Sequence, residues 1–139
     1  MKVWHKNLID VLPNALLIGQ FRDICEIAKL IATKGKTSNP FIDPILDWPE
    51  THLWVYARYL QAEMEKRGFY CEWQRFETWM PRYLSWSKEL PDIEDLFKGW
   101  HNDRYGNQCF YALQERYDRG LMSKADWERI EQHGKIVIS

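Results

Sequence analysis

A short run near the start of the chain holds residue types that can do chemistry. Residues 16–23 include Gln20, Arg22 and Asp23. Residues 1–5, at the start of the chain, are expected to lie beside this run. A guanidinium can bind a phosphate, and a carboxylate near a terminal amine can move a proton. The same charged pair is also typical of a solvated salt bridge on a helix surface. The run therefore indicates either an anion-binding, proton-transferring site or an ordinary surface helix.

The element expected to position this run is a helix over residues 15–33. Its apolar residues form one stripe, at positions 16, 17, 24, 27, 28 and 31, which leaves the polar residues of the run near the edges of the stripe. Asn14 is expected to cap the start of the helix, and Gly35 to end it. Residues 4–12 also have helical spacing, and Pro13 closes that segment because the residue before a proline avoids the helical region.

Further helices are predicted at 48–67, within 70–79, at 91–100, at 106–119 and at 123–133, with a turn or short helix at 83–90 and a strand-like tail at 136–138. Asp47 and Glu50 have the spacing of a capping box for the first of these helices, and Ser123 with Asp126 caps the last. We therefore predict an all-α fold: a single compact domain over residues 1–139, with two long helices and several short ones.

The composition excludes several classes of protein. Hydrophobic residues make up 45% of the 139-residue chain, which rules out a disordered protein. No apolar run approaches the roughly 20 residues that cross a bilayer, and nothing resembles a signal peptide, so we expect a cytoplasmic protein without membrane contact. The 3 cysteines and 4 histidines lack the spacing of metal ligands, so we expect reduced, buried thiols and neither a metal nor another cofactor.

The charge is distributed unevenly along the chain. The net charge of −1 is not the basic balance of a typical nucleic-acid-binding protein, but residues 1–39 hold six basic and three acidic groups, which suits an anionic ligand. Lys34 and Lys36 flank Gly35 in a loop that can approach a ligand closely, although the phosphate-binding loop pattern is incomplete. Eight tryptophans and seven tyrosines supply either the bulk of a core or stacking faces for nucleobases.

The order of three motifs resembles that of a known family. The motifs are the N-terminal segment with Trp4 and His5, the run at 16–23, and residues 63–69 at the end of the second long helix. Together they are similar to the pyrimidine-dimer DNA glycosylase family, typified by the phage enzyme called endonuclease V, and to bacterial relatives that begin with a basic residue and Leu/Val-Trp-His. The resemblance covers about residues 1–70, half of the chain.

The resemblance implies a single all-α domain and a covalent mechanism. In this family the N-terminal α-amino group attacks the sugar, and a glutamate on the following long helix assists. Asp23 stands at the position of that glutamate, and Arg22 at the position of a phosphate-binding arginine. The sequence departs from the family in the shorter aspartate and in Lys2, which replaces a small residue and hinders removal of Met1. The nucleophile is then the Met1 amine or the Lys2 side chain, or the chain has no nucleophile.

The chemistry of amines favours Met1. An α-amino group has an ordinary pKa of about 7.7–8.0, whereas a lysine ammonium, near 10.4, needs desolvation or neighbouring cations to lose its proton at neutral pH. Lys2 is then a solvated or phosphate-contacting charge. His5 either packs beside Trp4 or lines the site, and Gln20 either hydrogen-bonds a base or faces solvent.

Three functions of different classes are compatible with these residues. The first is a DNA glycosylase with abasic-site lyase activity, which acts on damaged pyrimidines in duplex DNA through a Schiff base. The alternative is a catalytically silent relative that binds or sequesters a small, cyclic or modified nucleotide, and the near-zero net charge, Asp23 and Lys2 favour it. The third function is that of an interaction module, which binds its partners through exposed aromatic residues. For either ligand, the expected contacts come from His5, Gln20, Arg22, Lys34 and Lys36.

Overall fold

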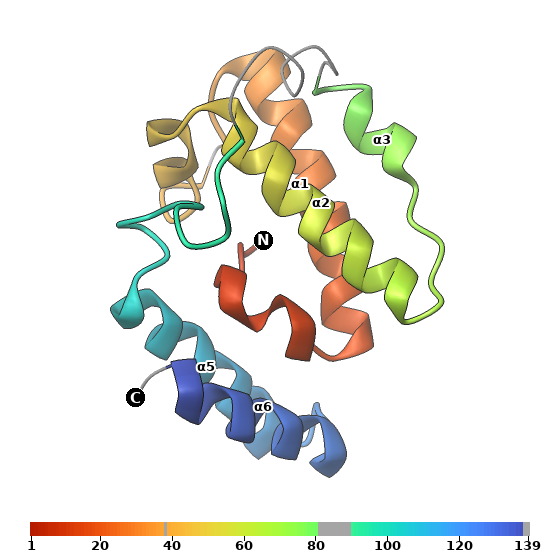
Figure 1. Cartoon of the computed structure of the whole chain (residues 1–139), viewed down its shortest axis with the longest axis vertical. Coiled ribbons are helices and arrows are strands. Elements are labelled where there is room, and N and C mark those ends of the chain that lie inside the picture. The colour runs from red at the N-terminus through yellow and green to blue at the C-terminus, as the bar shows by residue number, and fades with distance from the viewer. Residues whose placement is uncertain (38, 81–89, 138–139) are drawn as a thin grey trace.

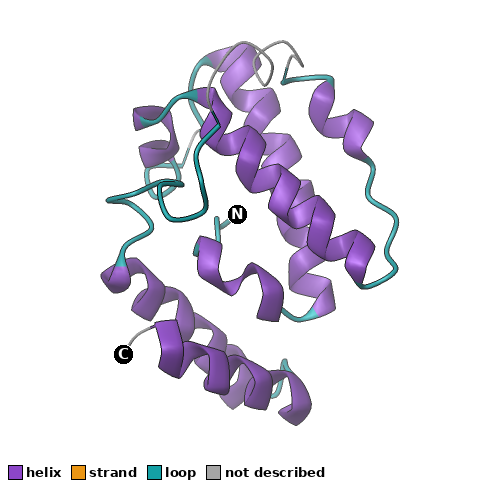
Figure 2. Cartoon of the chain, in the orientation of Figure 1, coloured by secondary structure: helices purple, strands orange, loops and turns teal. Residues whose placement is uncertain are grey.

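The computed structural model describes residues 1–37, 39–80 and 90–137, with side chains up to His133. Within these ranges the chain forms helices joined by loops and turns, and no strand (Figures 1 and 2). In chain order the elements are η1 (Lys6–Val11), α1 (Asn14–Lys34), η2 (Asp43–Asp47), α2 (Glu50–Lys66), α3 (Trp73–Glu77), α5 (Asp103–Asp118) and α6 (Lys124–Val137). The predicted all-α class is confirmed.

The helices pack as two pairs with the N-terminal segment between them. α1 packs against α2, and α5 packs against α6, while η1 contacts both α2 and α6. Figure 1 shows the first residues of the chain, in red, between the two pairs. Apolar side chains along this segment are buried in the core: Val3, Trp4, Leu8, Ile9, Val11 and Leu12. The start of the chain is therefore an internal element of the fold, and it is a 3-10 helix over Lys6–Val11 where a longer helix was predicted.

The predicted ends of α1 and α2 are only partly right. Gly35 ends α1 in the left-handed conformation at φ 71°, which a residue without a Cβ adopts without strain. Asn14, however, is the first residue of α1 and not its cap. The capping box of Asp47 and Glu50 does not form, because Asp47 belongs to η2 and Pro49 precedes α2. A proline fits there because its fixed φ leads into a helix and the missing N–H would lack an intrahelical partner.

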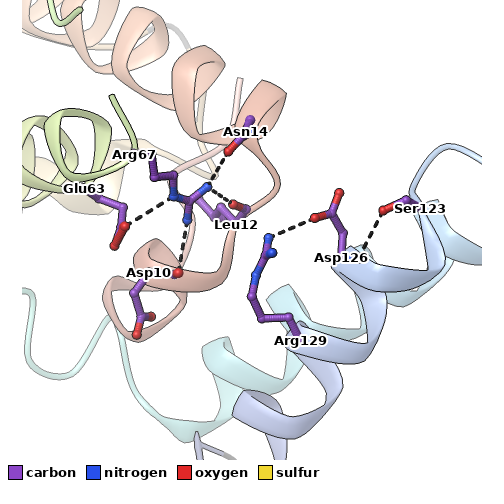
Figure 3. A network of polar contacts seen from close by, with 8 residues as sticks. All are labelled: Asp10, Leu12, Asn14, Glu63, Arg67, Ser123, Asp126 and Arg129. Carbon is purple, nitrogen blue, oxygen red and sulfur yellow. Dashed lines mark hydrogen bonds and ion pairs between the residues drawn. The ribbon is translucent and has the colours of Figure 1, made fainter. Parts of the chain in front are cut away.

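The side chain of Arg67 joins the start of α1 to the end of α2 (Figure 3). Its Nη1 donates to the Leu12 carbonyl oxygen at 2.6 Å and to Asn14 Oδ1 at 3.0 Å, and its Nη2 donates to the Asp10 carbonyl oxygen at 3.1 Å. Nε pairs with Glu63 Oε2 at 3.2 Å. The motif at 63–69 therefore has a structural role: it fixes the corner between η1 and α1.

The helix predicted over 91–100 is wrong, because this segment forms turns. The ammonium of Lys6, which is 5% exposed, donates to the carbonyl oxygens of Glu94 at 2.8 Å and Leu96 at 2.7 Å. In a helix these carbonyls would accept from N–H groups four residues further on. Phe97, at φ 51°, turns the backbone out of the helical region between these contacts and the next turn.

The last two helices begin and end differently from the prediction. The Asn102 side chain accepts from the Tyr105 N–H at 2.9 Å, so α5 begins before the predicted position 106. Ser123 Oγ accepts from the Asp126 N–H at 3.1 Å, as predicted for the start of α6. α6 continues through Gly134 to Val137, so the strand-like tail is wrong at 136 and 137; a glycine inside a helix costs only about 1 kcal/mol.

The other predicted elements have mixed outcomes. The short helix expected within 70–79 is confirmed as α3. The turn or short helix expected at 83–90 lies outside the described residues, apart from Leu90, and so does residue 138 of the tail. All three cysteines are buried. Among the helices that the structure describes, none combines the length and hydrophobicity that crossing a bilayer requires.

Candidate active site

The side chain of Gln20 holds the first residues of the chain against α1. Its Oε1 accepts from the Trp4 N–H at 2.6 Å and from the Tyr56 hydroxyl at 3.1 Å, and its Nε2 donates to the Lys2 carbonyl oxygen at 2.7 Å. The Tyr56 hydroxyl also lies 2.7 Å from the Trp4 carbonyl oxygen. Gln20 is only 2% exposed, so the predicted position at the edge of the apolar stripe is wrong. The amide aligns residues 2–4 along the helix.

A second set of contacts fixes the same segment from the side of α5. The Tyr105 hydroxyl donates to the Val3 carbonyl oxygen, and His101 Nδ1 accepts from the Lys6 N–H at 2.9 Å. The ring of His5 stacks on that of His101 with centroids 5.2 Å apart. His5 is buried and lines none of the cavities described below, so it packs within the core.

Burial changes the acid–base properties of this histidine pair. Desolvation lowers the pKa of His5 and lowers that of His101 well below its ordinary value. The nearby charge of Lys6 lowers both pKa values further. Both rings are therefore neutral at physiological pH, which suits a packing role.

The ammonium of Lys2 lies over two aromatic rings. Its Nζ is 5.2 Å from the centroid of Trp4 and 5.7 Å from that of Tyr105. The faces of aromatic rings carry negative potential, so this position stabilises a cation. The two rings thus hold the Lys2 side chain beside the start of the chain.

Residues of α1, α5 and the N-terminal segment surround a cavity of about 360 Å³. Met1, Lys2, Gln20 and Asp23 all line this cavity, and Arg116 lines it from α5. The remaining wall is largely apolar: Trp4, Ala15, Leu16, Gly19 and Ala112. The structure therefore brings together the three predicted catalytic residues, Met1, Lys2 and Asp23, and we call this space the N-terminal cavity.

The carboxyl group of Asp23 is electrostatically coupled to the start of the chain. Its partial burial raises the pKa of the carboxyl. Three weaker effects oppose this change in pKa: the positive terminal amino group, a backbone hydrogen bond from Lys2, and the charge of Arg22. The Asp23 carboxyl therefore lies near the start of the chain, where the charge of the terminal amino group influences its pKa.

Arg22 faces a different space from Asp23. Consecutive helix residues point about 100° apart, and Arg22 lines a separate cavity of about 220 Å³ with Tyr70 and Arg75. The two residues that the sequence places side by side are thus divided between two cavities on α1.

Lys34 and Lys36 lie away from the N-terminal cavity. Both are exposed at the C-terminal end of α1, and neither lines any of the cavities described here. Lys34 follows Asp23 by eleven residues, which is about 16 Å along a helix axis.

The sequence reasoning missed Arg116 as a candidate. The signal that could have found it is the spacing on α5: Tyr105, Cys109, Ala112 and Arg116 recur every three or four residues and share one face. That face packs on the N-terminal segment, since Tyr105 binds Val3 and Cys109 is fully buried.

No cluster of three or more His, Cys, Asp or Glu side chains suited to a metal ion occurs in the described ranges.

Comparison with known proteins gives one match. A family model described as pyrimidine dimer DNA glycosylase matches residues 1–81, more than half of the chain. The matched region contains Met1, Lys2, Gln20 and Asp23 and ends before α5, which supplies Arg116. No curated protein and no solved structure matches the chain.

Proposed function

The chain belongs to the pyrimidine dimer DNA glycosylase family, and from this we propose that it excises damaged pyrimidines from duplex DNA and then cleaves the abasic site through a Schiff base. One observation carries the proposal. Met1, Lys2 and Asp23 line the same cavity, and the terminal amino group is close enough to act on the pKa of the Asp23 carboxyl. An amine and a carboxyl are the two groups that this chemistry needs.

The terminal amine is the proposed nucleophile. Its nitrogen forms a bond to C1′ of the damaged nucleotide, and the bond from C1′ to the pyrimidine nitrogen breaks. The base leaves with that electron pair and takes up a proton. Opening of the sugar ring gives an iminium ion between the protein and C1′; removal of a proton from C2′ then expels the 3′ phosphate and cleaves the strand.

Asp23 is the proposed proton-transfer group. In its protonated form the carboxyl can give a proton to the departing base, and as a carboxylate it stabilises the iminium ion. Burial favours the first form by raising the pKa of this carboxyl. The effect of the Lys2 backbone on the pKa of this carboxyl supports the assignment, because it means that the shorter aspartate side chain lies close to the start of the chain.

Lys2 and Arg116 supply positive charge at the cavity. The Lys2 side chain lies over the rings of Trp4 and Tyr105, and this contact holds it in place beside the terminal amine. The guanidinium of Arg116 is suited to a phosphate of the bound strand.

Borohydride trapping on a duplex with one abasic site tests the proposal. Borohydride reduces an iminium to a stable amine, so the protein should become covalently attached to the DNA. Mass spectrometry of the adduct peptide should place the DNA on the terminal amine, and a chain acetylated at that amine should give no adduct. The absence of adduct from the unmodified protein would overturn the proposal.

Asp23→Asn tests the proton-transfer role. This change keeps the size of the side chain but removes its acid–base function, so strand cleavage should slow about 100-fold or more. Asp47→Asn, at an exposed position at the end of η2, is the matched control and should cleave at the wild-type rate. Equal rates for the two variants would exclude Asp23 as the proton-transfer group.

A further inference from the structure

Residues of η1, α2 and α6 line a further cavity, whose volume is about 550 Å³. It shares no lining residue with the N-terminal cavity, so the two are separate spaces. The volume lies within the range of about 300–1,000 Å³ that is typical of small-molecule sites. We call it the η1 cavity.

Apolar side chains form much of the wall of the η1 cavity. Ile9 lines it from η1, Tyr59 and Ala62 from α2, and Ile93 from the segment at 91–100. Tyr59, Ala62 and Lys66 are spaced three and four residues apart and share one face of α2. This wall suits the apolar body of a ligand, because the removal of apolar surface from water is favourable.

The buried ammonium of Lys6 brings positive charge to the same cavity. Lys6 lines the cavity and is 5% exposed. An ammonium has three N–H donors, and two of them donate here to the carbonyl oxygens of Glu94 and Leu96. The third has no acceptor among the residues that the structure describes. Burial lowers the pKa of this ammonium, so an anion beside it would replace part of the lost hydration.

The carboxylates of the η1 cavity have partners in the protein, whereas its lysines have none of opposite charge. Glu63 Oε2 lies 3.2 Å from Arg67 Nε. Asp10 Oδ1 lies 3.6 Å from His133 Nε2. Lys66 is exposed in the last turn of α2 and has no ion pair within the described ranges. The charge left for a ligand to balance is therefore positive.

We propose that the η1 cavity binds a small organic carboxylate with an apolar body, its charged group beside Lys6 and Lys66 and its apolar body against Ile9 and Tyr59. Hydrogen bonds between an ammonium and a carboxylate are charge-assisted and stronger than neutral ones. The inference goes beyond the proposed function, because none of the three proposed catalytic residues lines this cavity.

Calorimetric titration with octanoate and with octanamide tests this inference. The two probes have the same apolar chain, but only octanoate is charged. The wild-type protein should bind octanoate at one site and should bind octanamide at least about 10-fold more weakly, because the amide forms no charge-assisted bond. Equal affinity for the two probes, or no saturable binding of octanoate, would overturn the inference.

Two variants test the location of the bound carboxylate. Ala62 is exposed and lines the cavity, so the indole of Ala62→Trp should obstruct it and weaken octanoate binding at least about 10-fold. Lys66→Met should weaken binding about 1.5- to 5-fold, as expected for one exposed ion pair. The matched controls are Ala32→Trp and Lys34→Met, which are exposed on α1, line none of the cavities described here and should bind octanoate like the wild type.

The role of Lys6 is followed in the wild-type protein, because its replacement would also release the two carbonyl groups that it binds. The NMR resonance of its side-chain nitrogen should shift on addition of octanoate and stay unchanged with octanamide. Arg116→Met, in the N-terminal cavity, should leave the affinity for octanoate unchanged. Loss of octanoate binding in Arg116→Met, with wild-type affinity in Ala62→Trp, would place the anion in the N-terminal cavity and overturn the inference.

Discussion

Replacement of Gln20 by methionine should uncouple the N-terminal segment from α1. Methionine keeps the length and approximate volume of the side chain, so the core stays filled. The Trp4 N–H and the Lys2 carbonyl oxygen lose their partner, whereas the Tyr56 hydroxyl keeps the Trp4 carbonyl oxygen as acceptor. The change therefore isolates the two hydrogen bonds that fix residues 2–4.

The expected loss of stability follows from these two groups. A buried group without a hydrogen-bond partner costs about 1–3 kcal/mol, and the partly buried Lys2 carbonyl falls at the lower end because water reaches it. The free energy of unfolding of Gln20→Met should fall by about 2–4 kcal/mol. At about 3 °C per kcal/mol for a chain of this size, the melting temperature should fall by about 6–12 °C.

The assay is denaturant unfolding followed by tryptophan fluorescence, with the rate of borohydride-trapped adduct formation measured on the folded variant. A shift of the terminal amine by about 1 Å should slow adduct formation about 100-fold. Gln61→Met removes a surface hydrogen bond to Arg58 and is the matched control. An unfolding free energy within about 0.5 kcal/mol of wild type, together with an unchanged adduct rate, would refute the idea that Gln20 positions the amine.

Two further predictions concern stability. Because burial lowers the pKa of His5 and His101, the folded chain binds fewer protons than the unfolded chain below about pH 6.5. Urea unfolding should therefore show stability that falls on acidification below this pH, and a rise would contradict the burial of neutral rings. Arg67→Met should lower the free energy of unfolding by about 2–4 kcal/mol because it leaves Glu63 and three other oxygen acceptors unpaired. The same change at Arg119, whose pair with Glu115 has the same spacing but is exposed, should have no measurable effect in the same urea titration, and equal losses would refute the role of the buried network.

Local patterns were sufficient to predict the main helices. The apolar stripe and Gly35 define α1, and Ser123 with Asp126 defines the start of α6, because these signals act between residues a few positions apart. The segment at 91–100 could not be predicted in this way. Its carbonyl groups accept from the Lys6 ammonium, about 90 positions earlier in the chain, and no local pattern contains that contact.

In the candidate site, too, some features were predicted from the sequence and others depend on contacts between distant segments. The sequence selected Met1, Lys2 and Asp23, which the fold places in one cavity. It did not predict that Gln20 is buried and holds residues 2–4, because that role depends on partners in two other segments, residues 2–4 and α2. Arg116 was missed because its proximity to the site depends on how α5 packs on the N-terminal segment.

The central position of the N-terminal segment has a consequence for biosynthesis. The ribosome makes residues 1–12 before α5. The contacts that cover these residues from the far side, from His101 to Lys6 and from Tyr105 to Val3, become available only after α5 has been made. Closing such distant contacts is slow because the ordering of the intervening chain comes first. The nascent chain must therefore keep Trp4 and its apolar neighbours incompletely covered during most of its synthesis, when binding by chaperones and aggregation compete with folding.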